Sequence, residues 1–329
     1  MKKIMKMSRI MLTGIILFAT GCSQTTQTST EKIKIMLDWL PNTNHTGLYV
    51  ALENGYFKNQ GIDVEIIQPT DSPTEQLVAS NQAQFGISYQ EQMTYALTAK
   101  NPMPIKAIGT ILQHNTSGFA SVTSSGIKSP KDFAGKKYGA FGSPSEKAIL
   151  SGIMQSEGAS VNEVDIIQVD TGDFFTLVPN QVDFAWIFEG WTGMEAKLRG
   201  IDLNYIELRT VDETFDYYTP IIIGNNDFME KNPEVTKKLM SAITQGYIFS
   251  VKNPEAAATV FSKYVPEANP ELIKESQLFL STRYIDDAPY FGYMEESRWE
   301  RFATWLYEND LLETKLDVKE AFTNEYLSE

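Results

Sequence analysis

A single glutamate between aromatic residues is the feature of this 329-residue sequence that points most directly to chemistry. Glu189 follows an apolar segment at residues 183–187 (DFAWI), which is typical of a buried strand, and Phe188 and Trp191 flank it. A carboxylate beside aromatic faces can accept a hydrogen bond from the amino group of a flat heterocycle, and partial burial strengthens that bond. The alternative is an ordinary solvated glutamate in a loop. The position at a strand end and the aromatic neighbours favour a binding site.

A second group of polar and aromatic residues lies in the segment DWLPNTNHTG, residues 38–47. Trp39 follows a predicted strand and can supply an aromatic wall for stacking; the alternative is a core tryptophan that caps the strand. Asn42 and His45 can form hydrogen bonds with a ligand, but such side chains serve turns and helix caps at least as often. A metal-binding role is not expected for His45, because no carboxylate shares a ligand spacing with it.

Three further segments supply candidate ligand contacts. Tyr89 follows another predicted strand, where it can stack and form a hydrogen bond, or else pack beneath the adjacent helix. The turn with Gly142, Ser143 and Ser145 opens a predicted helix, so its N–H groups and hydroxyls can hold a carbonyl or anionic group. Alternatively, Ser143 only caps that helix. Tyr218 lies near a predicted connection between lobes and can close over a ligand.

The order of the predicted elements explains how these residues would come together. Strands and helices alternate through residues 32–112, and a second run of the same kind begins near residue 117. This alternation indicates mostly parallel sheets with helices on both faces. In such sheets ligands bind beyond the carboxyl ends of the strands, which is where the candidate residues fall.

We therefore predict an α/β fold of two lobes with a ligand cleft between them. The first lobe comprises residues 32–116 and 219–329, and the second comprises residues 117–218. Two hinge crossovers, near residues 114–119 and 215–220, would connect the lobes. No tandem repeat is evident in the sequence.

The first residues predict the cellular compartment. A basic head precedes an apolar run at residues 10–19, which is too short to span a bilayer as a helix. Small residues then precede Cys22, as in lipoprotein signal peptides. We expect residues 1–21 to be removed, Cys22 to be lipidated, and residues 22–31 to form a flexible tether at the extracytoplasmic face of the cell membrane. The alternative is a secretory signal followed by an unpaired cysteine.

Composition narrows the possible functions further. Cys22 is the only cysteine, which excludes disulfides, cysteine-ligated metals and thiol catalysis in the folded part of the chain. Removal of the signal takes away four basic residues and no acidic ones, so the net charge falls from −14 to about −18. This charge argues against nucleic acid as a partner. We expect a monomer without a cofactor or a metal ion.

Four motifs together resemble the thiamine-pyrimidine-precursor family of type II periplasmic binding proteins. They are DWLPNTNHTG at residues 38–47, GYFKNQGIDVEI at 55–66, QFGISYQEQ at 84–92 and SPKDFAGKKYGAFGSPSEKA at 129–148. The likeness extends from about residue 32 to the end of the chain. The first motif is similar to the pyrimidine-importer branch, whereas the second and fourth are common to many type II binding proteins.

The resemblance implies a substrate-binding lipoprotein of an ABC importer. Its ligand would be an aminopyrimidine, N-formyl-4-amino-5-aminomethyl-2-methylpyrimidine or hydroxymethylpyrimidine, delivered by cleft closure to an ABC permease and its ATPase. Binders of riboflavin or of sulfonate- or nitrate-type anions remain the alternative within the same fold. The candidate loops contain no Arg or Lys, which disfavours an anion.

The same fold has an enzymatic branch that makes the thiamine pyrimidine. The resemblance implies for that branch a lysine and a histidine near residues 88–92 and a cysteine cluster near the second crossover. This sequence has SYQEQ at residues 88–92 and FDYYT at residues 215–219. We therefore expect a binding protein and not an enzyme.

Overall fold

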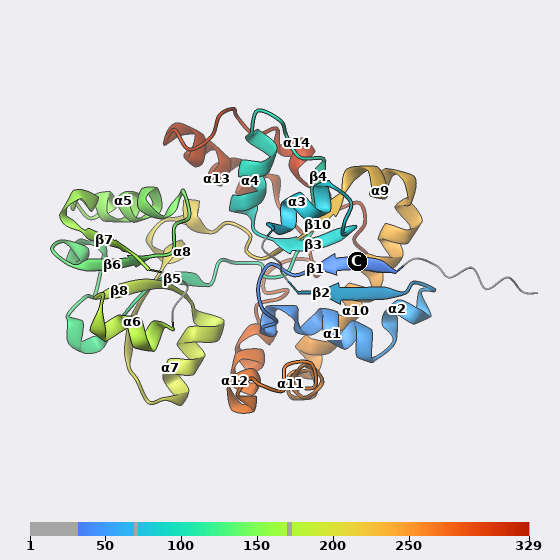
Figure 1. The fold of residues 1–329 in the computed structure, drawn as a ribbon, viewed down its shortest axis with the longest axis horizontal. Coiled ribbons are helices and arrows are strands. Elements are labelled where there is room, and N and C mark those ends of the chain that lie inside the picture. Colours follow the sequence, from blue (N-terminus) through green and yellow to red (C-terminus); the bar gives the residue numbers. More distant parts are fainter. Residues whose placement is uncertain (1–31, 69–71, 170–172, 329) are drawn as a thin grey trace, which may run out of the picture. The chain divides into compact units, whose positions relative to one another are not determined.

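The computed structural model describes residues 32–68, 72–169 and 173–328. The predicted signal peptide, Cys22 and the predicted tether at residues 22–31 lie outside the described residues. Within the described part, the strands form two five-stranded sheets (Figure 1). The first has the order β2 (Val64–Ile67), β1 (Ile33–Met36), β3 (Phe85–Ser88), β10 (Ile221–Asn225) and β4 (Ile105–Thr110). The second has the order β7 (Asp165–Gln168), β6 (Lys137–Ala140), β8 (Phe184–Phe188), β5 (Ser117–Val122) and β9 (Leu203–Glu207).

Both sheets are mostly parallel, as the sequence predicts, and each contains one antiparallel strand. β10 runs antiparallel to both of its neighbours in the first sheet, and β5 does so in the second. These are the strands that the chain enters after passing from one sheet to the other. The chain leaves each sheet at the carboxyl edge and enters the next at the corresponding edge, so the entering strand must run in the opposite direction.

Helices connect and cover the strands. Proline occupies the first position of three long helices, where its missing N–H costs no hydrogen bond. The helices associated with the first sheet are α1 (Thr46–Glu53), α2 (Tyr56–Asn59), α3 (Thr74–Ala79), α4 (Gln90–Thr98), α9 (Asn226–Lys231), α10 (Pro233–Lys252), α11 (Pro254–Ser262), α12 (Pro270–Ser281), α13 (Glu296–Glu308) and α14 (Val318–Ala321). The segments that follow second-sheet strands form α5 (Glu146–Ser156), α6 (Phe174–Asn180), α7 (Met194–Leu198) and α8 (Leu208–Val211). None of the helices in the described residues has both the length and the apolar composition needed to cross a bilayer.

Separate apolar cores lie under the two sheets. In the second lobe, Phe133 and Phe184 stack with their ring centroids 4.1 Å apart. The same core includes Phe302 and Leu306 from α13, in the carboxyl-terminal segment that the sequence analysis places in the first lobe. Helix α13 therefore packs its apolar face against the second lobe, while Trp299 on the same helix belongs to a core of the first.

Helix α1, which follows the DWLPNTNHTG segment, packs very closely against α10. A Cβ atom added at Gly246 would lie 2.0 Å from the backbone oxygen of Gly47. A Cβ atom at Gly47 would in turn lie 2.4 Å from ring atoms of Tyr247. Glycine at both positions lets the backbones approach, and this contact fixes where α1 begins.

We predict that Gly246→Ala destabilises the protein by about 1–3 kcal/mol, because the added methyl group collides with backbone atoms that have no free space to move into. Urea unfolding of the purified protein measures this change. Gln245→Ala is the matched control, since Gln245 is the exposed neighbour on the same helix. Equal midpoints for the Gly246→Ala variant and the wild type would contradict the prediction.

Candidate functional site

Large hydrophobic side chains are exposed where strands end. Six such side chains are exposed among the described residues, and four of them, Trp39, Leu40, Phe141 and Phe188, lie at or just after the carboxyl ends of β1, β6 and β8. Trp39 is 50% exposed, Phe141 47% and Phe188 41%. Because β6 and β8 are parallel neighbours, Phe141 and Phe188 share one edge of the second sheet. Exposed apolar groups at the carboxyl ends of strands are typical of a ligand-binding surface, so these residues are candidates for one.

Asp38 is the buried acid beside this surface. Its Oδ1 lies 2.6 Å from Nε2 of His45, and its Oδ2 accepts a hydrogen bond of 2.6 Å from the hydroxyl of Tyr89. The backbone N–H of Asn42 donates to Nδ1 of His45 over 3.2 Å, so Nε2 carries the proton and donates to Asp38. Burial favours a raised pKa for Asp38, but the electrostatic interaction with His45 and the bonds from His45 and Tyr89 outweigh it and lower the pKa. Two of the predicted site residues, His45 and Tyr89, therefore hold one ionised carboxylate.

Asn42 acts within its own loop. Its Oδ1 accepts a hydrogen bond from the backbone N–H of Asn44 over 3.0 Å, and its Nδ2 donates to the Leu40 oxygen over 3.2 Å. This is the capping role that the sequence left as the alternative to ligand contact. The loop is also held from outside, because Tyr284 and Tyr247 donate to the backbone oxygens of Thr43 and Asn44.

The turn that precedes α5 already holds a carboxylate. Oε2 of Glu146 accepts hydrogen bonds from the backbone N–H groups of Gly142 and Ser143, over 2.6 and 2.8 Å. Its Oε1 accepts bonds from the Phe141 N–H and the Tyr138 hydroxyl. Glu146 is only 3% exposed. The N–H groups predicted to hold a carbonyl or anionic group are thus occupied by a side chain of the protein.

The serine hydroxyls of this turn bind a residue of the other lobe. Ser143 and Ser145 each donate to Oε1 of Glu91 over 2.5 Å. Glu91 lies in the first turn of α4 and is buried, and burial raises the pKa of its carboxyl although the two hydroxyl bonds oppose the rise. The start of α4 and the start of α5 are therefore connected across the two lobes.

Glu189 begins a π-helical turn, Glu189–Gly193, directly after β8. Its carboxylate is half-buried and accepts no hydrogen bond from the described residues. Burial raises its pKa, while the nearby Arg283 guanidinium opposes the rise. Glu189 and Tyr205 line a pocket of about 280 Å³ together with residues of α7 and β9, none of which the sequence predicted for the site. Glu189 is thus an acid with an available acceptor.

Ser276 on α12 joins the two predicted segments. Its hydroxyl donates to the backbone oxygen of Gly190, which follows Glu189, and lies 2.5 Å from the hydroxyl of Thr43. The hydroxyl is buried, so these bonds are shielded from water. The segment that carries Phe188, Glu189 and the half-buried Trp191 is in this way tied to the loop that carries His45.

The prediction of a ligand contact for Tyr218 requires correction. The side chain has no exposed surface, and its hydroxyl accepts a hydrogen bond from the backbone N–H of Glu295 over 2.8 Å. The guanidinium carbon of Arg298 lies 4.6 Å from the ring centroid. The backbone N–H of Tyr218 donates a hydrogen bond to Oε1 of Gln90. Tyr218 therefore connects α13 with the first sheet and is part of the core.

A buried donor near the site was missed by the sequence analysis. Nε1 of Trp186 has no hydrogen-bond partner in the described part of the chain. Trp186 lies two residues before Phe188 on β8, and its ring centroid lies 6.0 Å from that of Phe141. Alternation along a strand places Trp186 and Phe188 on the same face, so the DFAWIF pattern contained this signal. Unpartnered buried donors require an explanation, and a ligand acceptor is one.

Comparison with known proteins gives the family. Residues 42–257 match the family model described as NMT1/THI5 like. The formylaminopyrimidine-binding protein of Halalkalibacterium halodurans is 29% identical over 94% of this chain and 96% of its own length. A 4-amino-5-hydroxymethyl-2-methylpyrimidine phosphate synthase of Saccharomyces cerevisiae is 23% identical over 91% of this chain and 89% of its own.

Solved structures give the fold. The alkanesulfonate-binding protein SsuA from Xanthomonas axonopodis pv. citri, bound to MOPS, superposes with a TM-score of 0.68. It covers 89% of this chain and 98% of its own at 12% identity, which is evidence for the fold alone. With two α/β lobes of the periplasmic binding protein type and a family match over most of its length, the chain belongs to the NMT1/THI5-like family.

Proposed function

We propose that the protein binds a thiamine-related aminopyrimidine, such as formylaminopyrimidine, outside the cytoplasm and delivers it to an ABC permease. The observation that carries this proposal is the group of exposed aromatic side chains at the strand ends, beside the Glu189 carboxylate, which has no hydrogen-bond partner among the described residues. A flat ring stacks on aromatic faces, and the amino group of the pyrimidine donates to Glu189. The unpartnered N–H of Trp186 is suited to an acceptor on the ligand, such as a ring nitrogen.

The charges at the site favour an amine over an anion. Asp38, Glu91 and Glu189 are acidic, and the N–H groups best placed to hold an anion are occupied by Glu146. The two guanidinium groups near Glu189 also have neighbours of their own. Arg209 pairs with Glu207 at 2.7 Å, and Arg283 lies over the ring of Phe279. A sulfonate or nitrate would meet several carboxylates, and the nearby cation that no described carboxylate pairs with is Arg283.

The relatives support binding rather than synthesis. The formylaminopyrimidine-binding protein matches over nearly the full length of both chains, and the synthase match is more distant. The sequence has no lysine within residues 88–92 and a single cysteine, Cys22, in the whole chain. The groups that the family resemblance implies for the synthase are therefore not available.

Closure of the lobes is the proposed route of capture and release. The polar contacts between the lobes are the hydrogen bonds of Glu91 with Ser143 and Ser145 and that of Ser276 with Gly190. Lobes that rotate about the two crossovers would form or break these contacts as a unit. Lipidation of Cys22 would keep the protein next to its permease, and a monomer suffices for this mechanism.

Isothermal titration with a panel of ligands tests the proposal. We expect saturable binding of formylaminopyrimidine or hydroxymethylpyrimidine at one site per chain, and no heat of binding with taurine or nitrate. Riboflavin and thiamine serve as the larger ring controls. Saturable binding of taurine alone, or riboflavin as the tightest ligand, would contradict the assignment.

A second prediction concerns Glu189. Glu189→Gln should weaken pyrimidine binding by about 1–3 kcal/mol, because a charge-assisted hydrogen bond becomes a neutral one. Glu195→Gln is the control: it makes the same chemical change on the adjacent helix α7, where the carboxylate already pairs with Arg199. If both variants bind like the wild type, Glu189 does not contact the ligand.

A third prediction concerns the anchor. Cys22→Ser should release the protein from the membrane fraction of the producing cells, because acylation requires the thiol. Immunoblots of membrane and soluble fractions measure the distribution, and mass spectrometry of the wild type should find a diacyl or triacyl group on the amino-terminal cysteine. Wild-type protein in the soluble fraction would argue for the secretory alternative.

A further inference from the structure

The first crossover carries a histidine that is held by the second. His114 lies between β4 and β5, and its Nδ1 is 2.7 Å from Oδ2 of Asp216, which lies between β9 and β10. Asp216 also accepts a hydrogen bond from the backbone N–H of Asn115 over 3.0 Å. A guanidinium nitrogen of Arg298 lies 3.5 Å from Oδ2 of Asp216. An ionised carboxylate can only accept, so Nδ1 carries a proton. The orientation of the imidazole is thereby fixed.

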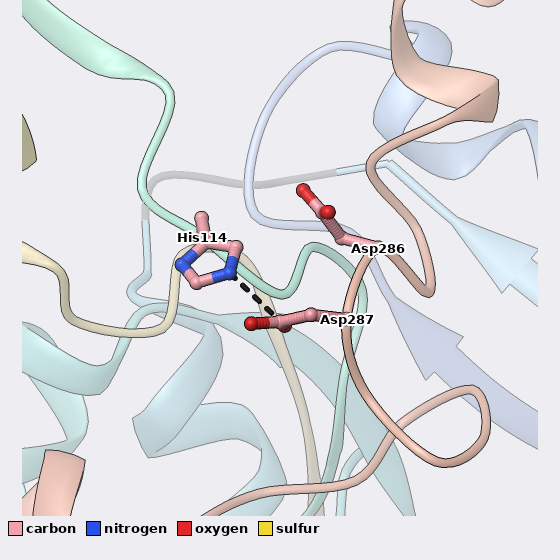
Figure 2. Close-up of side chains that lie close together, drawn as sticks. All are labelled: His114, Asp286 and Asp287. Carbon is pink, nitrogen blue, oxygen red and sulfur yellow. Dashed lines mark hydrogen bonds and ion pairs between the residues drawn. The ribbon is translucent and has the colours of Figure 1, made fainter.

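The other ring nitrogen faces two adjacent aspartates. Figure 2 shows Asp286 and Asp287 projecting from one loop, after α12, toward the imidazole ring of His114. Nε2 is 3.1 Å from Oδ1 of Asp287, and one ligand atom from each of the three residues lies within 4.8 Å of the other two. His114 is more than 170 positions away from the two adjacent aspartates in the sequence, so no local motif indicates the cluster.

We propose that His114, Asp286 and Asp287 bind a divalent transition-metal ion of the Zn²⁺ class at the hinge, with Asp216 supporting the histidine. One imidazole nitrogen and two carboxylate oxygens are a usual ligand set for such ions, with water completing the coordination. A histidine that binds a metal through one nitrogen normally donates its other N–H to a carboxylate. The bond from His114 to Asp216 has this arrangement.

The geometry requires only a small contraction. In a tetrahedral site with bonds of about 2.1 Å, ligand atoms lie about 3.4 Å apart. Asp286 and Asp287 are exposed on a loop, and the Asp287 side chain is 73% exposed, so their carboxylates can move inward without disturbing the core. His114 and Asp216, which must stay in place, are 16% and 13% exposed.

A proton and a metal ion compete for Nε2. The hydrogen bond to Asp216 raises the pKa of His114, while burial and the Arg298 guanidinium oppose the rise. In the protonated form Nε2–H donates to Asp287. Arg209 also lies near Asp286, so the acidic groups Asp216, Asp286 and Asp287 are opposed by two guanidinium groups. A metal ion can bind Nε2 only when this nitrogen carries no proton.

The site has a role distinct from the ligand-binding residues. A metal ion held by the crossover and by the loop after α12 would fix the hinge against the first lobe. Neither His114 nor the two aspartates is among the residues assigned to the ligand.

Zinc titration of the chelator-treated mature chain tests the inference. We expect one Zn²⁺ per chain in competition with a chromophoric chelator at neutral pH, and release of protons in buffers of different ionisation enthalpy. The double variant Asp286→Asn/Asp287→Asn should lose affinity by about tenfold or more, and Asp216→Asn by about 10–100-fold.

Asp310→Asn is the matched control. Asp310 is exposed and has a positive φ of 58°, similar to 46° at Asp286, but it lies outside the cluster. The Asp310→Asn variant should bind Zn²⁺ with the same affinity as the wild type. Because the aspartates at positions 286 and 287 are on the surface, their double variant should fold even if Asp216→Asn does not. Absence of stoichiometric binding by the wild type, or unchanged affinity in the double variant, would overturn the proposal.

Discussion

The carboxylate of Asp38 is buried and receives a donor on each oxygen, and the arrangement of the proposed ligand site depends on it. A buried carboxylate stays ionised only when hydrogen bonds replace its water, and His45 and Tyr89 supply those bonds. The two donors come from the loop after β1 and from the residue after β3, which are parallel neighbours. The interaction therefore holds both strand ends together and places Trp39, the adjacent residue, at the surface of the first lobe.

The glutamates near the proposed ligand site differ in how many hydrogen bonds their carboxylates already accept. Glu146 accepts four hydrogen bonds from its own lobe, and Glu91 accepts two from the other lobe. Glu189 accepts no hydrogen bond from the described residues, so both of its carboxylate oxygens are available to a donor. Under the proposed function, the turn N–H groups that could hold an anion are occupied by Glu146, whereas Glu189 remains available to an amine. The proposed preference for an amine therefore depends on which groups already form hydrogen bonds and not on the net charge.

Much of the architecture was predictable, because it follows from local patterns. Strands and helices alternate through residues 32–112 as the sequence predicts, and Trp39, Tyr89 and Glu189 each follow a strand. Contacts made by distant segments were not predictable. Tyr218 was wrongly assigned to the ligand because its environment comes from Glu295 and Arg298, and the link through Ser276 depends on how α12 packs. The role of Glu146 depends on the backbone conformation of the preceding turn, which local sequence patterns do not specify.

The strand order of the first sheet has a consequence for biosynthesis. β10 lies between β3 and β4, so β4 has no neighbour in the sheet until residue 225 has emerged from the ribosome or the translocation channel. The second sheet uses only residues 117–207 and needs no later strand, although helix α13 later covers part of its core. During vectorial synthesis the second lobe therefore acquires its complete sheet first. The first sheet stays incomplete until β10 can insert between β3 and β4. In a nascent chain stopped before β10, one edge of β3 is unpaired and β4 has no partner in the sheet, and unpaired strand edges favour association with other chains.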